Sequence, residues 1–238
     1  MDQKNESSIT TAVSMDPVTS ARPPFVQLDD DQRVAQAGVA RANLAPSYDK
    51  PEGTTDNDWA ERHKHQSVLQ QHLDFFDQDR DGIIHPLDTF TGFRRLGFGH
   101  PLSLLSVLII HSTFSYPTLP SVIPDPLFRI YIANIHRCKH GSDSGAYDNE
   151  GRFVPQKFED IFSKYGPGDG LTIWDLWDFH RGQRVLVDPL GWFGQVFEWV
   201  ATYLMIWPED GKMKKEEIRG IFDGSFFYTI AARRRGAK

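Results

Sequence analysis

The segment after Ser67 carries apolar residues at helical spacing. The capping-box pattern of Ser67 and Gln70 places the first residue of this helix at Val68. One polar residue, His72, interrupts the apolar row. A histidine on a face that packs into a core needs either a hydrogen-bond partner or a ligand, so this residue raises a functional question. The row consists of Leu69, His72, Leu73 and Phe76.

Helical patterning recurs through the rest of the chain, and no long alternation of apolar and polar residues predicts a sheet. We therefore expect a mainly α fold. Residues 1–58, rich in Ser, Thr, Asp, Pro and Ala, are expected to form a mobile arm, with order beginning near Trp59. Further helices are expected at residues 87–96, 128–140, 156–165, 173–183, 192–207 and 214–222. The last of these is expected to have a solvated start that contains Lys212, Lys214 and Lys215.

Acidic residues alternate along the loop that follows the first helix. Their spacing is that of an EF-hand, a helix–loop–helix calcium site, with Gly82 at the sharp turn. Asp88 stands at the last ligand position, where such loops normally carry the longer Glu, which predicts weaker calcium binding. A solvated acidic turn is the alternative. The predicted calcium ligands are Asp77, Asp79, Asp81, the backbone carbonyl of Ile83, and Asp88.

Two later loops, at residues 165–170 and 206–211, also place Asp-Gly at the turn positions of such a motif. Both precede helical sequence, but neither has acids at the first two ligand positions. We expect degenerate EF-hand-like loops that keep the helix–loop–helix shape without an ion. Two ordinary glycine-containing turns are an equal alternative.

Residues 96–124 contain no Asp, Glu, Lys or Arg. The apolar part, residues 101–116, would form a helix of about 24 Å, which is short for a bilayer core of about 30 Å. The prolines that follow disfavour a continuing helix, so the predicted structure is a hairpin that enters a membrane and leaves on the same side. A buried helix of a soluble protein is the alternative. The prolines of this predicted membrane anchor are Pro117, Pro120, Pro124 and Pro126.

Composition narrows the class of protein. The net charge of −6 and the lack of a nucleic-acid-binding motif give no reason to expect nucleic acid as a partner. Cys138 is the single cysteine, so no disulfide forms within the chain. The N-terminus lacks the pattern of a secretory signal peptide. We expect an EF-hand region at 59–96, a hydrophobic segment at 97–127 and a helical C-terminal region at 128–238.

These motifs occur in one characteristic order. A helix with SVLQQH is followed by one calcium loop, an uncharged segment that closes in a proline knot, IYIANIHRCKHGSDSGAYDNEGRF and FDGSFFYTIA. Over about residues 60–230 the chain resembles the caleosins, the lipid-droplet peroxygenases of plants and fungi, and we expect a fungal-type member.

The resemblance implies a cofactor, a reaction and a location. Caleosins bind calcium and also haem b, and their haem-binding histidines match His72 and His140. They reduce a fatty acid hydroperoxide and pass its oxygen to an unsaturated fatty acid or another acceptor, by hydroxylation, epoxidation or sulfoxidation, without NADPH. The implied location is the phospholipid monolayer of lipid droplets and the endoplasmic reticulum membrane, as a monotopic protein that faces the cytosol. An oligomer is compatible with the sequence.

Other interpretations of the same residues remain open. His72 would otherwise be a core histidine bonded to a backbone carbonyl. His136 and His140 lie four residues apart, a spacing that also suits zinc, and Cys138 is either a haem ligand or an ordinary thiol. The alternative function is a calcium-dependent coat or tethering protein of lipid droplets without catalysis. If both His72 and His140 bound one iron, no coordination position would be free, so one of them would have to leave or act as an acid–base group.

Overall fold

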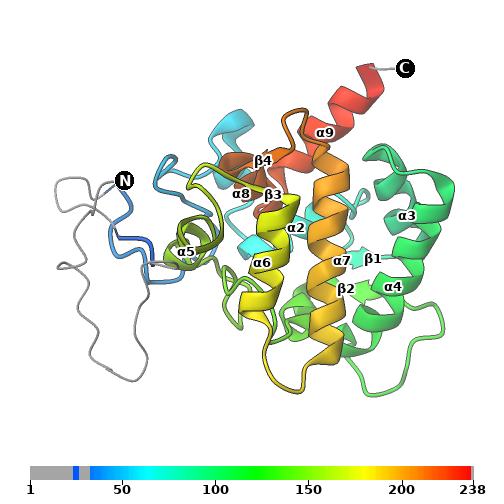
Figure 1. The fold of residues 1–238 in the computed structure, drawn as a ribbon. Helices are drawn as coiled ribbons and strands as arrows, with labels where there is room; N and C mark the ends of the chain where they lie inside the picture. The colour runs from blue at the N-terminus through cyan, green and yellow to red at the C-terminus, as the bar shows by residue number, and fades with distance from the viewer. Residues whose placement is uncertain (1–23, 27–32, 237–238) are drawn as a thin grey trace.

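The computed structural model describes residues 24–26 and 33–236. Helices dominate it, and its strands are only two or three residues long, as a mainly α fold predicts (Figure 1). The elements are η2 (Asp56–Asp58), α1 (Trp59–Arg62), α2 (Val68–Asp74), β1 (Ile83–Ile84), α3 (Pro86–Arg95), α4 (His100–Thr118), β2 (Ile130–Tyr131), η3 (Ile132–Cys138), α5 (Pro155–Tyr165), β3 (Gly170–Thr172), α6 (Ile173–Gln183), α7 (Pro189–Ile206), β4 (Lys212–Lys214), α8 (Lys215–Phe222) and α9 (Ser225–Gly236).

The acidic loop joins α2 to α3. Helix α2 begins at Val68, and both hydrogen bonds of the predicted capping box between Ser67 and Gln70 are present. Gly82 adopts a left-handed φ of +80°, which a residue with a Cβ rarely adopts. The strand after this turn, β1, pairs antiparallel with β2, so Ile83 lies opposite Tyr131. The acidic loop is therefore fastened to the segment that follows the uncharged helix α4.

The C-terminal half contains two helix–loop–helix units, α5 with α6 and α7 with α8. The strands that end their loops, β3 and β4, pair antiparallel, with Leu171 opposite Met213. Both side chains are fully buried in a phenylalanine-rich core. This arrangement has the helix–loop–helix shape that the sequence predicts for residues 165–170 and 206–211.

Helix α4 has an inverted distribution of side chains. Its buried residues are all polar: Ser103, Ser106, His111, Ser115 and Thr118. Many of its apolar side chains, including Leu104 and Leu108, are instead exposed. Within the described part of the chain, no helix has both the length and the apolar character that a membrane crossing requires.

Order begins earlier than the sequence predicts. Residues 33–58 were expected in a mobile arm, but Arg41 forms a β-bridge with Phe153, and Ala45 is buried in the core. Thr54 donates a 2.5 Å hydrogen bond to the buried carboxylate of Asp223. The expectation of a mobile arm is therefore wrong for residues 33–58, while residues 1–23 and 27–32 lie outside the described residues.

Two further expectations need correction. The predicted helix at 128–140 is instead strand β2 followed by the 3₁₀ helix η3, because Ile130 and Tyr131 pair with β1. Lys215, which the sequence suggested lies at a solvated helix start, is buried and pairs with Glu159 at 3.0 Å and Asp49 at 2.5 Å. The sequence did not predict α9, whose Phe227 packs against Phe75. The division of the remaining chain into regions at 59–96, 97–127 and 128–238 stays a prediction.

Candidate active site

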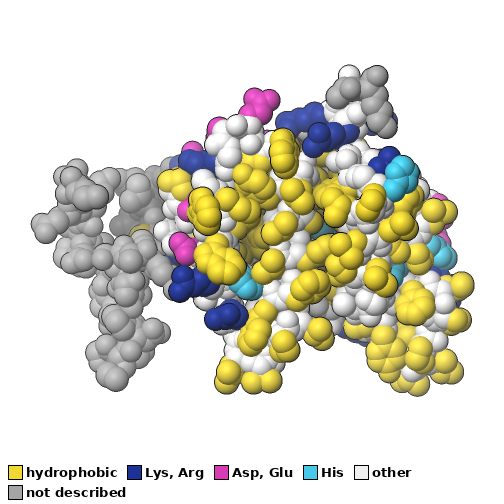
Figure 2. Space-filling model, turned by 45° about the vertical axis from the view of Figure 1, so that its right-hand side comes forward, with side chains coloured by type: hydrophobic (Ala, Val, Ile, Leu, Met, Phe, Trp, Pro, Cys, Tyr) yellow, Lys and Arg dark blue, Asp and Glu magenta, His cyan; other side chains and the backbone are white. Residues whose placement is uncertain are grey.

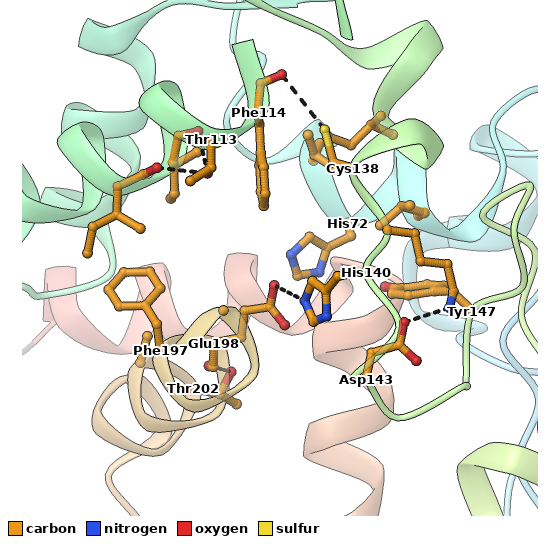
Figure 3. Close-up of a pocket in the computed structure, with 18 of the residues that line it drawn as sticks. His72, Thr113, Phe114, Cys138, His140, Asp143, Tyr147, Phe197, Glu198 and Thr202 are labelled. Carbon is orange, nitrogen blue, oxygen red and sulfur yellow. Dashed lines mark hydrogen bonds and ion pairs between the residues drawn. The ribbon is translucent and has the colours of Figure 1, made fainter. Parts of the chain in front are cut away.

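An apolar cavity of about 540 Å³ lies between α2, α4, α7 and the segment after η3. This volume is within the range of small-molecule and cofactor sites, roughly 300–1,000 Å³. Figure 3 shows Thr113 and Phe114 of α4 on one side of the cavity and Phe197 and Thr202 of α7 on another. His72 and His140, which the sequence singles out, both line it although they are far apart in the chain.

His72 reaches the cavity from α2. Its Nδ1 lies 2.7 Å from the carbonyl oxygen of Ile221, and since a carbonyl can only accept, this nitrogen carries the proton and donates. The ring also packs edge-on against Phe227, with centroids 5.0 Å apart. Burial lowers the pKa of His72, so the neutral ring keeps a lone pair on Nε2. A neutral imidazole whose Nδ1 is tied to a carbonyl is in the protonation state that a metal ligand needs.

His140 has a different environment. Its Nε2 lies 3.7 Å from the Oε1 of Glu198 on α7, an ion-pair distance longer than a hydrogen bond. The Glu198 carboxylate raises the pKa of His140, although burial opposes this shift. The Nδ1 of His140 is buried without a hydrogen-bond partner. Figure 3 shows the His140 ring directed towards Glu198, with His72 also on the wall of the cavity.

Glycine on α7 makes room for His140. A Cβ at Gly194 would lie 3.2 Å from the His140 Nε2, which is closer than most such contacts. Neither Gly194 nor Glu198 stood out as a functional residue in the sequence. The available signal for Glu198 was its position as the sole charge of α7.

Other polar groups of the cavity are already satisfied. The hydroxyl of Tyr147 donates a 2.5 Å hydrogen bond to the carbonyl of Phe222, and burial raises the pKa of Tyr147 well above its ordinary value. Burial also raises the pKa of Cys138 to about 12, so its sulfur is a protonated thiol at neutral pH. This favours the ordinary-thiol interpretation of Cys138. His136 does not line the cavity, and the described residues contain no histidine cluster suited to zinc.

The acidic loop brings together three of the predicted calcium ligands. One carboxylate oxygen each from Asp77, Asp79 and Asp81 lies within 4.8 Å of the others, which is a cluster that could hold a metal ion. Burial raises the pKa of Asp77, and the nearby carboxyl groups of Asp79 and Asp81 raise it further. Asp88 is not part of this cluster, because its Oδ2 accepts a 2.8 Å hydrogen bond from the His85 N–H.

The loops at 165–170 and 206–211 hold lysine ammonium groups instead of an acidic cluster. Lys212 Nζ lies 2.8 Å from Asp169, and Lys214 Nζ lies 2.5 Å from Asp210. Each loop aspartate is therefore neutralised by a cation from the chain itself. The antiparallel pairing of β3 with β4 joins the ends of the two loops.

The prolines of the uncharged segment lie where α4 ends and the chain turns back. Pro117 is in the last turn of α4, whereas the other three lie in the connection to β2, at residues 119–129. We call this connection the proline-rich loop. Within this loop, the carboxylate of Asp125 forms a 2.7 Å ion pair with Arg129.

Comparison with known proteins identifies the family. Residues 64–231 match the family model of caleosin-related proteins. A peroxygenase of Lilium longiflorum is 44% identical over 94% of this chain and 92% of its own length. The probable peroxygenase 4 of Arabidopsis thaliana is 38% identical over 71% and 87%, respectively.

A third relative is named a probable inactive peroxygenase-like protein, also from Arabidopsis thaliana, and is 28% identical over 64% of this chain and 73% of its own length. No solved structure matches the chain. All three relatives are plant proteins, so the fungal-type expectation stays a prediction. The family model covers most of the described chain, and together with the Lilium match it shows that the protein belongs to the caleosin family.

Proposed function

We propose that this caleosin is a haem peroxygenase that transfers oxygen from fatty acid hydroperoxides to lipid acceptors. The observation that carries the proposal is His72, a neutral imidazole fixed through Nδ1 with Nε2 left for a metal inside an apolar cavity. The two relatives named peroxygenase and probable peroxygenase support it. The apolar lining suits both a porphyrin and a fatty acid chain.

The residues present fit haem b. His72 would hold the iron, because its Nδ1–H···O=C bond is the usual support of a ligating histidine. When bound, haem supplies the redox chemistry: the hydroperoxide loses one oxygen atom and becomes the alcohol, and the acceptor gains that atom, so NADPH is not consumed.

His140 would transfer the proton of the hydroperoxide. Its Nε2 faces the Glu198 carboxylate, which stabilises the protonated ring. His140 would take the proton from the hydroperoxide and return it to the oxygen that leaves with the alcohol. Under this proposal only His72 is required as a permanent ligand, so a coordination position stays free for the hydroperoxide.

The test is the absorption spectrum of haem-reconstituted protein. Wild type is expected to show a Soret band and hydroperoxide-dependent epoxidation. His72→Ala should lose both, whereas His140→Ala should keep the band and lose most of the turnover, about 10²–10⁴-fold. His136→Ala is the matched control, since His136 does not line the cavity. A wild-type protein that stays colourless with added haem would overturn the proposal.

We further propose that the acidic loop binds one calcium ion through the predicted set of Asp77, Asp79, Asp81, the Ile83 carbonyl and Asp88. The clustered carboxylates support this proposal. Asp88 would have to exchange its bond to the His85 N–H for the ion. The lysine-paired loops are proposed to be degenerate EF-hands without an ion. Calcium titration by calorimetry should give one site, lost in Asp77→Ala, and two or more tight sites would contradict the assignment.

We also propose that α4 and the proline-rich loop lie in a phospholipid monolayer, on lipid droplets and the endoplasmic reticulum. The polar buried face and apolar exposed face of α4 support this, because that distribution is favourable only against an apolar surrounding. Flotation of the protein with phosphatidylcholine-coated triolein emulsions is the test. Recovery of wild type in the aqueous fraction would contradict it.

The second candidate function is a coat or tethering protein without catalysis. The relative named probable inactive peroxygenase-like protein favours it. The spectrum separates the two functions, because a coat protein would float with the emulsion and bind no haem.

A further inference from the structure

Two loops display the most exposed apolar residues at one end of the molecule. One is the proline-rich loop after α4, and the other joins α6 to α7 at residues 184–188, which we call the α6–α7 loop. Both hang below the helices in Figure 1, and Figure 2 shows two groups of apolar side chains along the same edge. Val122 is 85% and Ile123 74% exposed in the first loop, while Leu186 is 90% and Val187 83% exposed in the second.

Each loop holds one bulky apolar residue in a left-handed backbone conformation. Phe128 has a φ of +51° and Val187 a φ of +57°. A β-branched or aromatic residue rarely adopts such a conformation, and strain of this kind collects at functional positions. Exposure of several large apolar side chains to water is unfavourable, so the two loops share an unusual need for an apolar partner.

The helices that rise from the two loops are apolar on their exposed sides. On α7, Phe193, Val200 and Leu204 follow at helical spacing and are all exposed, and Glu198 is the sole charge. Helix α4 has exposed leucines and no acidic or basic residue other than histidine. The apolar surface of α4 therefore continues onto α7 at the same side of the molecule (Figure 2).

The cavity opens within this apolar surface. Leu190 and Phe193 of α7 line the cavity and are also exposed, and so is Thr113 of α4. The cavity lined by His72 and His140 therefore reaches the surface at these residues of α4 and α7.

We infer that the α6–α7 loop and α7 form a second lipid contact, which seats the mouth of the cavity on the monolayer so that a lipid hydroperoxide enters from lipid. The inference rests on the proposed function and names the side from which its substrate comes. A phospholipid surface is the partner that fits, because the two separate apolar loops and the exposed apolar face of α4 lie on one side of the molecule. Arg181, near the end of α6, and Arg184, the first residue of the α6–α7 loop, are exposed and suit lipid phosphates.

The carboxylate of Asp188 in the α6–α7 loop does not oppose the proposed contact with lipid. Asp188 is occupied at the start of α7, where its carboxylate accepts hydrogen bonds from the N–H of Ser142 at 2.8 Å and of Gly191 at 3.1 Å. Its charge is therefore directed into the protein and towards the helix N-terminus, where it is stabilised.

Val187→Asp tests the inference with little risk of misfolding. Asp accepts a left-handed φ more readily than Val, and the side chain is exposed and does not line the cavity. Val39→Asp is the matched control: the same residue type, 52% exposed, in the N-terminal segment beside α5. The first measurement is sedimentation of the full chain with phosphatidylcholine vesicles. Val187→Asp should weaken binding about tenfold, and Val39→Asp should not change it.

The second measurement is the ratio of two turnover rates of haem-loaded protein. The substrates are linoleic acid hydroperoxide in a phosphatidylcholine-coated triolein emulsion and cumene hydroperoxide in water. Val187→Asp should lower the emulsion rate relative to the aqueous rate by about the factor lost in binding. Equal vesicle binding by wild type and Val187→Asp would overturn the lipid contact, as would a dimer that Val187→Asp converts to a monomer with unchanged vesicle binding. A wild type inactive on both hydroperoxides would refute the proposed function, while the vesicle comparison would still decide the lipid contact.

Discussion

Replacement of Gly194 by alanine is expected to separate stability from activity. Glycine inside a helix costs about 0.5–1 kcal/mol relative to alanine, so α7 should gain stability, and Tm should rise by roughly 1–4 °C. The new methyl group would lie 3.2 Å from the His140 Nε2, and the ring would have to move by a few tenths of an ångström. It would also cover the nitrogen that faces Glu198.

The proposed proton transfer through His140 should suffer accordingly. We expect kcat/KM for a fatty acid hydroperoxide to fall roughly tenfold to a hundredfold, with the Soret band retained because His72 is untouched. Thermal unfolding and initial rates on the same preparation are the assays. Gly38→Ala is the control, since a Cβ there meets nothing within 4 Å. Wild-type turnover in Gly194→Ala, or turnover lost together with stability, would refute this account of His140.

Three further predictions concern stability and calcium. Lys215→Met leaves the buried Glu159 carboxylate without its cation and should cost about 3–5 kcal/mol. Burial already raises the pKa of Glu159, so the carboxyl group is more easily protonated at low pH and then needs no cation. In urea unfolding, the loss of stability in Lys215→Met should therefore be smaller at about pH 4 than at about pH 7. Equal losses at the two pH values would contradict this. Asp88→Glu adds the missing methylene and should tighten calcium binding about tenfold or more in calorimetry, whereas weaker binding would show that Asp88 matters only as a helix cap. His111→Phe removes a buried ring that bridges Thr89 and the proline-rich loop at 2.8 and 2.6 Å, and should cost about 1–3 kcal/mol in urea unfolding, an expectation that a loss near zero would refute.

Elements with local signals were predictable from the sequence. The helix from Ile173 to Gln183 begins after a Thr172 capping box, and α2 begins after that of Ser67, so residues three apart in the chain define both starts. The segment at 128–140 carries apolar residues that suit a helix, but its pairing with β1 depends on residues almost fifty positions earlier. No local pattern contains that information, and the tertiary contact overrides helix propensity there.

The residues of the candidate site also differ in whether a local sequence pattern reveals them. His72 was recognisable as a polar residue on an apolar helix face, and His140 through its motif. Glu198 stood out only as the sole charge of its helix, because its contact with His140 depends on how α7 packs against the segment after η3. The low-complexity composition of the N-terminal segment likewise concealed its buried contacts, since Thr54 and Ala45 are stabilised by α8 residues such as Arg219.

The pairing of β1 with β2 couples the proposed calcium loop to the segment that follows the proline-rich loop. Ile83, whose carbonyl is a proposed calcium ligand, sits in the same two-stranded ladder as the residues that bring the chain back from the proline-rich loop. Thermodynamic linkage then works in both directions: if an ion stiffens this ladder and favours docking of the loop on a monolayer, the monolayer must raise the affinity for the ion by the same factor. A droplet surface would thus act as a co-ligand for calcium, and the protein would report on lipid and ion jointly instead of sensing either one by itself.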